Sequence, residues 1–259
     1  MAQPRRFSER VAVVFGANSQ PLPEAFSQPS LFDGFPAETA AEKLRQQGFC
    51  SGLQLPLPLV RQIFDHASIT PCVRHSEDRE RFRIGEVQDG FTPSGAPVGT
   101  ADVVFPGCDA VDRVSCDATL VEIARLYLGY RPQRVARRLF WSPVSSLPDQ
   151  VRRECGQTID YHYDIEPHNS LYVFFYITGA DHNSGSHVTV ARSHKPKPLP
   201  IIWSSAFQPA ARVLERYGAD SPVVIEGGPG YGFLEDPACF HKALPPTGHD
   251  RLVLQLRYS

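Results

Sequence analysis

Hydrophobic positions follow two different periods along the chain. In the N-terminal half, apolar residues recur every three or four positions, which indicates amphipathic helices. This spacing predicts helices at about 37–47, 56–66 and 118–128. The first is closed by Gly48, and Asp117 can cap the third.

From about residue 134 the pattern changes to short apolar runs separated by turn residues, which is typical of β-strands. The predicted strands are 134–142, 157–163, 171–178, 186–191, 222–226, 230–234, 238–242 and 251–258. One helix, at about 207–217, interrupts them. Strands at this spacing predict a two-sheet jelly roll, in which the N-terminal helices cover the outer face of one sheet.

No linker divides the chain, so we expect one domain over 1–259. Residues 1–35 are predicted to form an irregular arm, 36–130 a helical support and lid region, and 131–259 the jelly-roll core with a metal site. The segment 70–110 is charged and rich in Gly and Pro, as mobile active-site lids often are. The expected class is therefore mainly β with flanking helices.

Composition narrows the choice of partners. The 259 residues are 42% apolar and 21% charged with a net charge of −2, which is ordinary for a globular protein. This charge implies no general attraction to nucleic acid or to an anionic membrane. No apolar run is long enough for a bilayer or a signal peptide, so we expect a cytoplasmic location. The sequence predicts no particular oligomeric state.

Two histidines and one aspartate form the main chemical candidate. His162 and Asp164 are two residues apart, so on a strand their side chains point to the same face. His241 ends a distant apolar run and can supply a third ligand. Two imidazoles and a carboxylate on one face of a metal form the facial triad of non-haem Fe(II) oxygenases. A second His-x-acid pair, His75 and Glu77, lies in a charged stretch that we expect to be a solvated loop.

Arg251 is the candidate that distinguishes an oxygenase from a simple metal-binding domain. It opens the apolar run 252–256, and a buried Arg is rare unless it is paired. A dicarboxylate cosubstrate would be its natural partner. The turn at 245–248 could make the strand of Arg251 a neighbour of the strand of His241.

The C-terminal half resembles the phytanoyl-CoA dioxygenase-like family of Fe(II)/2-oxoglutarate-dependent oxygenases. The resemblance covers about 120–258, and 41–49 is similar to the opening helix of that family. The segments that carry it are 161–164, 171–178, 183–195, 240–242 and 251–256.

The resemblance implies a double-stranded β-helix, a cupin-like jelly roll. It implies that His162, Asp164 and His241 bind Fe(II) and that Arg251 holds the far carboxylate of 2-oxoglutarate. The chain departs from the family at Ala243, where some members have Ser, and at Arg192, where many have Gly.

The reaction implied is oxidation of a small molecule by O2, with release of succinate and CO2. No catalytic group beyond the metal centre is implied. Hydroxylation is favoured over halogenation, because iron halogenases of this family have Gly or Ala where this chain has Asp164. The alternatives are desaturation, epimerisation or another oxidation at the same site, and a non-catalytic metal-binding jelly-roll module. A role in specialised metabolism is expected from the breadth of the family.

Weaker candidates complete the predicted site. Tyr172 and Asn169 are candidates for hydrogen bonds to the cosubstrate, although a place among the core aromatics is the favoured interpretation of Tyr172. Arg138 and Trp141 can face the substrate, although a half-exposed strand also explains them. We interpret His187 as a structural residue that holds a loop.

Overall fold

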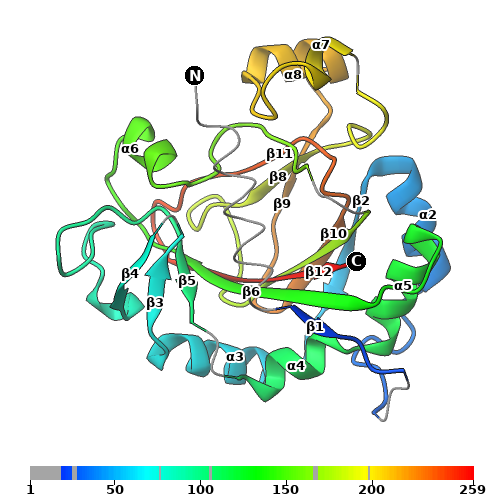
Figure 1. The fold of residues 1–259 in the computed structure, drawn as a ribbon, viewed down its shortest axis with the longest axis horizontal. Coiled ribbons are helices and arrows are strands. Elements are labelled where there is room, and N and C mark those ends of the chain that lie inside the picture. Colours follow the sequence, from blue (N-terminus) through cyan, green and yellow to red (C-terminus); the bar gives the residue numbers. More distant parts are fainter. Residues whose placement is uncertain (1–18, 25–27, 76, 105–106, 166–168, 198) are drawn as a thin grey trace.

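Two antiparallel sheets lie one above the other in the computed structural model, which describes residues 19–24, 28–75, 77–104, 107–165, 169–197 and 199–259 (Figure 1). The strand order in the larger sheet is β2-β10-β7-β12-β6-β5-β3-β4, and β1 pairs with β6. The smaller sheet has the order β11-β8-β9.

The strands of the larger sheet are β1 (Ser19–Pro21), β2 (Phe49–Gln54), β3 (Cys72–Arg74), β4 (Glu77–Phe82), β5 (Ala101–Val103), β6 (Arg134–Ser142), β7 (Leu171–Tyr176), β10 (Tyr231–Glu235) and β12 (Arg251–Tyr258). Those of the smaller sheet are β8 (His187–Val190), β9 (Pro222–Ile225) and β11 (His241–Ala243).

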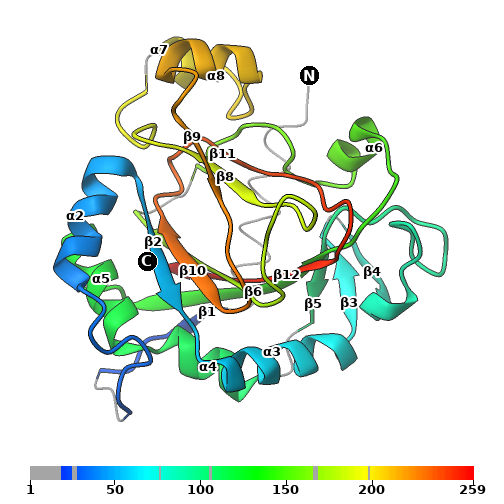
Figure 2. The same ribbon diagram turned by 180° about the vertical axis from the view of Figure 1, so that it is seen from behind.

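Helices cover the outer face of the larger sheet, as Figures 1 and 2 show. They are α2 (Ala37–Gln47), α3 (Leu57–Ile69), α4 (Asp109–Ser115) and α5 (Ala118–Leu128). The other helices are η1 (Ile84–Glu86), α6 (Asp149–Glu154), α7 (Leu199–Ile202) and α8 (Ala210–Tyr217). Among the described helices, none has both the length and the apolar content needed to cross a membrane.

The alternation of strand side chains creates two separate apolar layers. On β7, Val173 and Phe175 pack outward with the helices, whereas Tyr172, Phe174 and Tyr176 pack inward between the sheets. All six residues of β7 are buried, because this strand has the helices on one face and the smaller sheet on the other. The inner layer forms the floor of the cavity described below.

Most predicted elements are confirmed, and the differences lie near the site. The helices at 37–47 and 118–128 and the strands at 134–142 and 251–258 have the predicted bounds. No regular strand covers 157–163; only His162 makes isolated bridges there.

The neighbourhood expected for Arg251 is wrong. β12 lies in the larger sheet between β6 and β7, whereas β11 lies in the smaller sheet. The turn after β11 therefore carries the chain from one sheet to the other. As a result His241 and Arg251 belong to opposite sheets and do not sit on neighbouring strands.

The segment 70–110 contains β3, β4 and β5, which continue the larger sheet beyond β6. Its longest connection, 83–100, includes η1. The movement of this segment over a ligand stays a prediction. Of the N-terminal arm, 1–18 and 25–27 lie outside the described residues, and β1 pairs with β6.

Candidate metal centre

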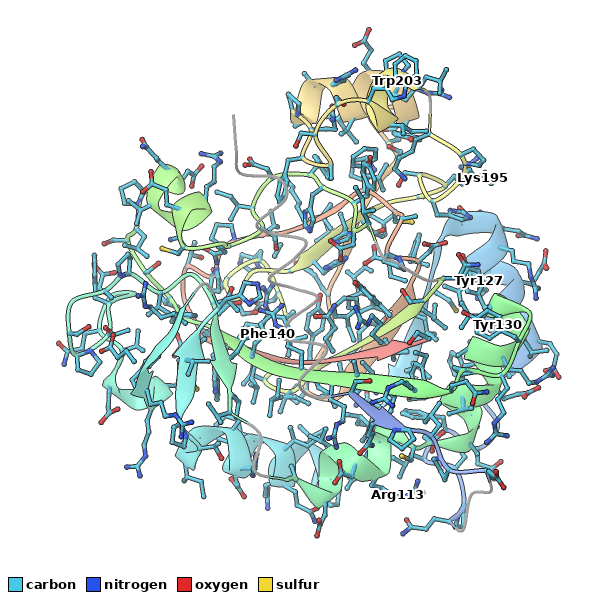
Figure 3. All side chains as sticks on the ribbon, in the orientation of Figure 1. Arg113, Tyr127, Tyr130, Phe140, Lys195 and Trp203 are labelled. Carbon is cyan, nitrogen blue, oxygen red and sulfur yellow. The ribbon has the colours of Figure 1, made fainter. Side chains whose placement is uncertain are left out.

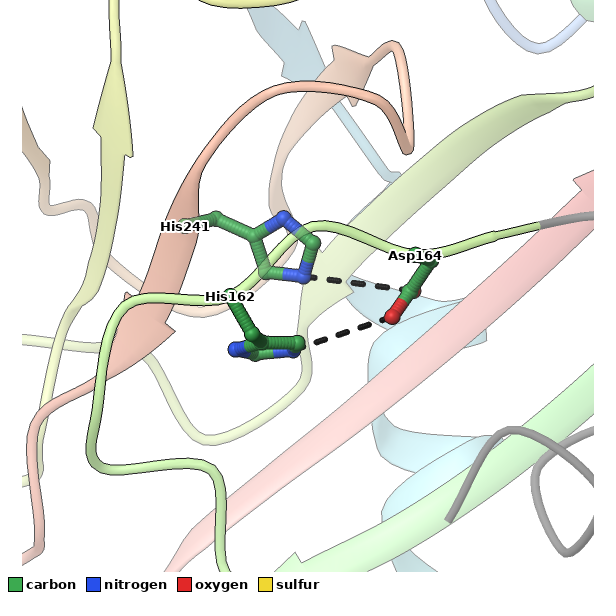
Figure 4. Close-up of side chains that lie close together, drawn as sticks. All are labelled: His162, Asp164 and His241. Atoms are coloured by element: carbon green, nitrogen blue, oxygen red, sulfur yellow. Dashed lines mark ion pairs between the residues drawn. The ribbon is translucent and has the colours of Figure 1, made fainter. Parts of the chain in front are cut away.

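Three side chains converge between the two sheets (Figure 4). One ligand atom from each of His162, Asp164 and His241 lies within 4.8 Å of the other two. Nε2 of His162 is 3.8 Å from Oδ1 of Asp164, and Nε2 of His241 is 3.9 Å from Oδ2. Ligands bound at about 2.0–2.2 Å to one ion are separated by roughly 3–4 Å, so this arrangement fits one metal ion.

Backbone pairing brings the two histidines together. The amide of His162 donates to the carbonyl of His241 at 2.9 Å, and the reverse bond is 2.8 Å. Their rings lie 4.3 Å apart at 62°, and the ring of Phe207 stacks on His162 at 5.0 Å. The amide of Asp164 donates to the carbonyl of Pro237 at 2.9 Å, which places the carboxylate beside both rings.

Backbone carbonyls orient both imidazoles. Nδ1 of His162 lies 3.1 Å from the carbonyl of Asp160, and Nδ1 of His241 lies 3.0 Å from the carbonyl of Cys239. A carbonyl only accepts, so each Nδ1 carries the proton and each Nε2 presents its lone pair. Burial, together with nearby His162, lowers the pKa of His241 to about 3, which keeps its ring neutral for metal binding.

Arg251 is buried in the same cavity without an acidic partner. It is 3% exposed, Nη2 donates to Ser142 Oγ at 3.3 Å, and Nε has no hydrogen-bond partner. In the described part of the chain, no carboxylate lies within ion-pair distance of this guanidinium. Burial lowers the pKa of Arg251, which reflects the cost of an unpaired charge in this position. An anionic ligand would remove that cost.

One cavity contains both the triad and Arg251. The empty space inside it, counted together with open solvent at its mouth, is about 780 Å³. Phe174, Phe233 and Val253 form an apolar part of its wall.

A buried His–Glu pair lies beside the triad. The ring of His187 stacks on that of His241 at 5.4 Å and 23°, and its Nε2 is 2.9 Å from Oε2 of Glu235. Burial favours the neutral form of both groups: it raises the pKa of Glu235 to about 7 and lowers the pKa of His187 to about 3. The interpretation of His187 as a structural residue stays a prediction, and its side chain also lines the cavity.

The structure places the two tyrosines of β7 differently. Tyr172 faces the interior and packs against Phe174 at 5.9 Å, but it does not line the cavity. Tyr176 does line it; its hydroxyl donates to the carbonyl of Ile225 at 2.9 Å and accepts from the amide of His187 at 3.0 Å.

Asn169 and Trp141 lie outside the cavity. Asn169 is exposed in a separate groove, which shares Asp164 with the cavity. Trp141 occupies the outer face of β6 and packs on Phe64 of α3 at 5.8 Å. Arg138, on the inner face of β6, does line the cavity.

The prediction that His75 lies in a solvated loop is wrong. His75 is 7% exposed, and its Nδ1 lies 2.7 Å from Oδ2 of Asp102. It is buried because β3, which precedes it, joins the larger sheet next to β5. No local pattern indicates this pairing, since Asp102 is 27 residues further along the chain.

The chain matches no protein-family model and no curated protein. It is similar in structure to AviO1 from Streptomyces viridochromogenes Tue57, with 17% identity, a TM-score of 0.56, and coverage of 86% of this chain and 95% of the other. It is also similar to EvdO2 from Micromonospora carbonacea var. aurantiaca, with 16% identity, a TM-score of 0.59, and coverage of 87% of this chain and 91% of the other. A third similar structure is the epimerase SnoN in complex with Fe3+, alpha ketoglutarate and nogalamycin RO. It has 16% identity, a TM-score of 0.58, and coverage of 86% of this chain and 82% of the other. These similarities confirm the predicted jelly roll with flanking helices.

Proposed function

We propose that the protein is an Fe(II)- and 2-oxoglutarate-dependent dioxygenase that hydroxylates a small molecule. The observation that carries this proposal is the buried Arg251, which has no acidic partner within the described ranges and shares a cavity with a His-Asp-His triad. Bound iron and 2-oxoglutarate supply, with O2, an oxidant that breaks a substrate C–H bond and release succinate and CO2.

Each residue of the site has one role in this proposal. His162, Asp164 and His241 hold the metal, and the carbonyls of residues 160 and 239 fix the two rings. Arg251 binds the far carboxylate of 2-oxoglutarate, since a guanidinium forms two parallel hydrogen bonds with a carboxylate. No further catalytic group is required.

Ser142 offers the hydroxyl that the chain lacks at Ala243. Its Oγ lies 3.3 Å from Nη2 of Arg251, and both residues line the cavity. We infer that Ser142 orients the guanidinium and can donate to the same carboxylate. Tyr172 and Asn169 do not line this cavity, so the proposal assigns them no contact with the cosubstrate.

A second outcome from the same site, epimerisation, is favoured by one observation. SnoN, which has the same fold, is described as an alpha ketoglutarate-dependent epimerase from nogalamycin biosynthesis. Placement of the substrate decides between outcomes, and it depends on residues other than the triad. We infer a role in specialised metabolism on the same grounds. The alternative of a non-catalytic metal-binding module leaves Arg251 unexplained.

The test is the affinity for 2-oxoglutarate of Arg251→Lys, with Arg257→Lys on the same strand as the matched control. Lys keeps the positive charge but loses the paired hydrogen bonds, so we expect affinity to fall by about tenfold or more. Calorimetry with the metal-loaded protein measures it, and a parallel titration should show unchanged metal affinity. Equal 2-oxoglutarate binding by Arg251→Lys and the unmodified protein would contradict the assignment, and a loss in Arg257→Lys instead would transfer it to Arg257.

A further inference from the structure

Polar side chains form one wall of the cavity. This polar wall consists of His75, Thr100, Arg138, Gln157 and Gln255. Arg251 pairs with Ser142 on β6, and Arg138 is four residues further along that strand, so their backbone positions are roughly 13 Å apart along the sheet. The two arginines therefore stand at separate positions on the larger sheet.

Asp102 cancels the charge of Arg138. Nε of Arg138 donates to Oδ1 of Asp102 at 2.7 Å, and Oδ2 lies 2.7 Å from Nδ1 of His75. Burial alone would raise the pKa of Asp102, but Arg138 and His75 outweigh it and lower the pKa to about 2. The guanidinium also lies 4.2 Å from the centre of the Phe140 ring, which lies above β6 on the side of the smaller sheet (Figure 3). Arg138 is thus rigidly held and already neutralised, unlike Arg251.

Gln157 lines the cavity, and its amide has an unused donor. Its Oε1 accepts from Nη1 of Arg152 at 3.1 Å, and Arg152 is itself fixed by the carbonyls of Leu147 and Ser145. This contact determines the orientation of the amide, so its NH2 group points away from Arg152. Gln157 is 5% exposed, and Nε2 has no partner among the described residues. A buried donor without an acceptor is costly, which indicates a ligand atom at this position.

We propose that the polar wall binds a neutral oxygen of the substrate, a carbonyl or hydroxyl group, through Nε2 of Gln157 and the guanidinium of Arg138. The class of substrate is therefore an uncharged, oxygen-bearing molecule. A carboxylate would lie beside the ionised Asp102 in a buried place and would find its countercharge already used. This inference rests on the proposed function for its catalytic meaning, but binding at the wall can be measured independently.

Acetophenone and benzoate are suitable probes, since they have similar shapes but carry a neutral carbonyl and a carboxylate. Each is titrated by saturation-transfer NMR into the full chain loaded with Zn(II) and saturated with 2-oxoglutarate, which occupies Arg251. We expect acetophenone to bind at least about tenfold more tightly than benzoate. Equal or tighter binding of benzoate, or no binding of acetophenone, would overturn the proposal.

Gln157→Met removes the donor and keeps the side-chain length. We expect it to weaken acetophenone binding about tenfold, the equivalent of one buried hydrogen bond, and to leave 2-oxoglutarate affinity unchanged. Gln150→Met, on the exposed surface of nearby α6, is the matched control and should bind as the unmodified protein does. Unchanged acetophenone affinity in Gln157→Met would also refute the proposal.

The same samples separate the two proposals. If 2-oxoglutarate fails to bind while acetophenone binding still depends on Gln157, the proposed function is wrong and the polar wall stands. If 2-oxoglutarate binds and the probe shows no dependence on Gln157, the polar wall is wrong and the cosubstrate site stands.

Discussion

At the residue scale, a buried arginine, Arg251, and a half-buried one, Arg138, line the same cavity but have opposite electrostatic surroundings. Arg138 forms an ion pair with Asp102, whereas the side chain of Arg251, among the described residues, donates a hydrogen bond to the hydroxyl of Ser142 and pairs with no carboxylate. An unpaired buried charge is stable only when a ligand supplies the opposite charge, so Arg251 suits an anion and Arg138 suits a neutral group. The difference lies in one carboxylate on β5, which shows why the type of residue alone does not define its ligand.

The three side chains of the candidate metal centre could be predicted from the sequence, but their surroundings could not. The spacing of His162 and Asp164 and the position of His241 in an apolar run were local signals, and the structure brings the three together. Glu235, the partner of His187, and Asp102, the partner of His75 and Arg138, are placed by pairing between distant strands, which no local pattern reveals.

Asp164→Asn should abolish tight metal binding. The amide keeps the shape of the side chain but removes the charge that two neutral imidazoles cannot supply. Loss of a group that merely orients a ligand costs about 10–100-fold in affinity, so we expect loss of the carboxylate itself to cost more. Calorimetry with Ni(II) measures this change.

Asp160→Asn is the control for that substitution. Asp160 lies two residues before His162, but its side chain pairs with Arg153, and only its carbonyl contacts the imidazole. We expect its metal affinity to match that of the unmodified protein. Equal affinities in Asp164→Asn and Asp160→Asn would show that Asp164 is not a ligand.

At the scale of elements, local signals determined the helices and long strands, and non-local pairing determined the rest. Asp117 accepts from the amides of Thr119 and Leu120, and Gly129 ends the same helix with φ 81°, so both bounds of α5 were readable. β2 was missed because its position depends on pairing with β10, far along the chain. The strand predicted at 157–163 does not form, because His162 alone makes β-bridges in this segment.

Gly185 lies just before β8 and packs against the chain that follows β11, near the candidate metal site. It has φ 78°, and a Cβ added there would lie 2.2 Å from the carbonyl oxygen of Leu244, in the connection that follows β11. We therefore expect Gly185→Ala to lower the free energy of unfolding by at least about 2 kcal/mol, from backbone strain and displacement of this connection. Urea unfolding measures the change.

Gly95→Ala is the matched control, because Gly95 has φ 84° but nothing within 4 Å of its added Cβ. Only the conformational cost of a left-handed residue applies there, about 1 kcal/mol. Similar losses at both positions would mean that the contact with Leu244 does not constrain the fold.

At the scale of the whole molecule, the two sheets divide the functional tasks. The triad is supplied by the smaller sheet and the chain beside it, whereas Arg251 and Arg138 stand on the larger sheet, which the helices support. The cavity exists because β12 and β11 belong to different sheets. The jelly roll could be inferred from strand spacing and resemblance, but this assignment of strands to sheets required the structure.

The cluster of Asp102, His75 and Arg138 also links three strands of the larger sheet, so its ionisation should affect the stability of the whole protein. The pKa of Asp102 is about 2 when folded, below its ordinary value of 3.8. Between these values the unfolded chain binds more protons, so stability rises with pH through this window and is lost as pH falls from about 4 to 2. A difference of this size corresponds to about 2 kcal/mol.

Comparison of the unmodified protein with Asp102→Asn isolates this contribution in metal-free samples. At pH 6 we expect Asp102→Asn to be less stable by about 3 kcal/mol, because Arg138 then lacks its countercharge. As pH falls to 2 the unmodified protein loses the pH-dependent contribution that the variant never had, so the difference between their free energies of unfolding should narrow by about 2 kcal/mol. Asp149→Asn, at an exposed position on α6, should follow the unmodified protein throughout. Curves for Asp102→Asn and the unmodified protein that stay parallel from pH 6 to pH 2 would mean that the cluster does not hold Asp102 ionised.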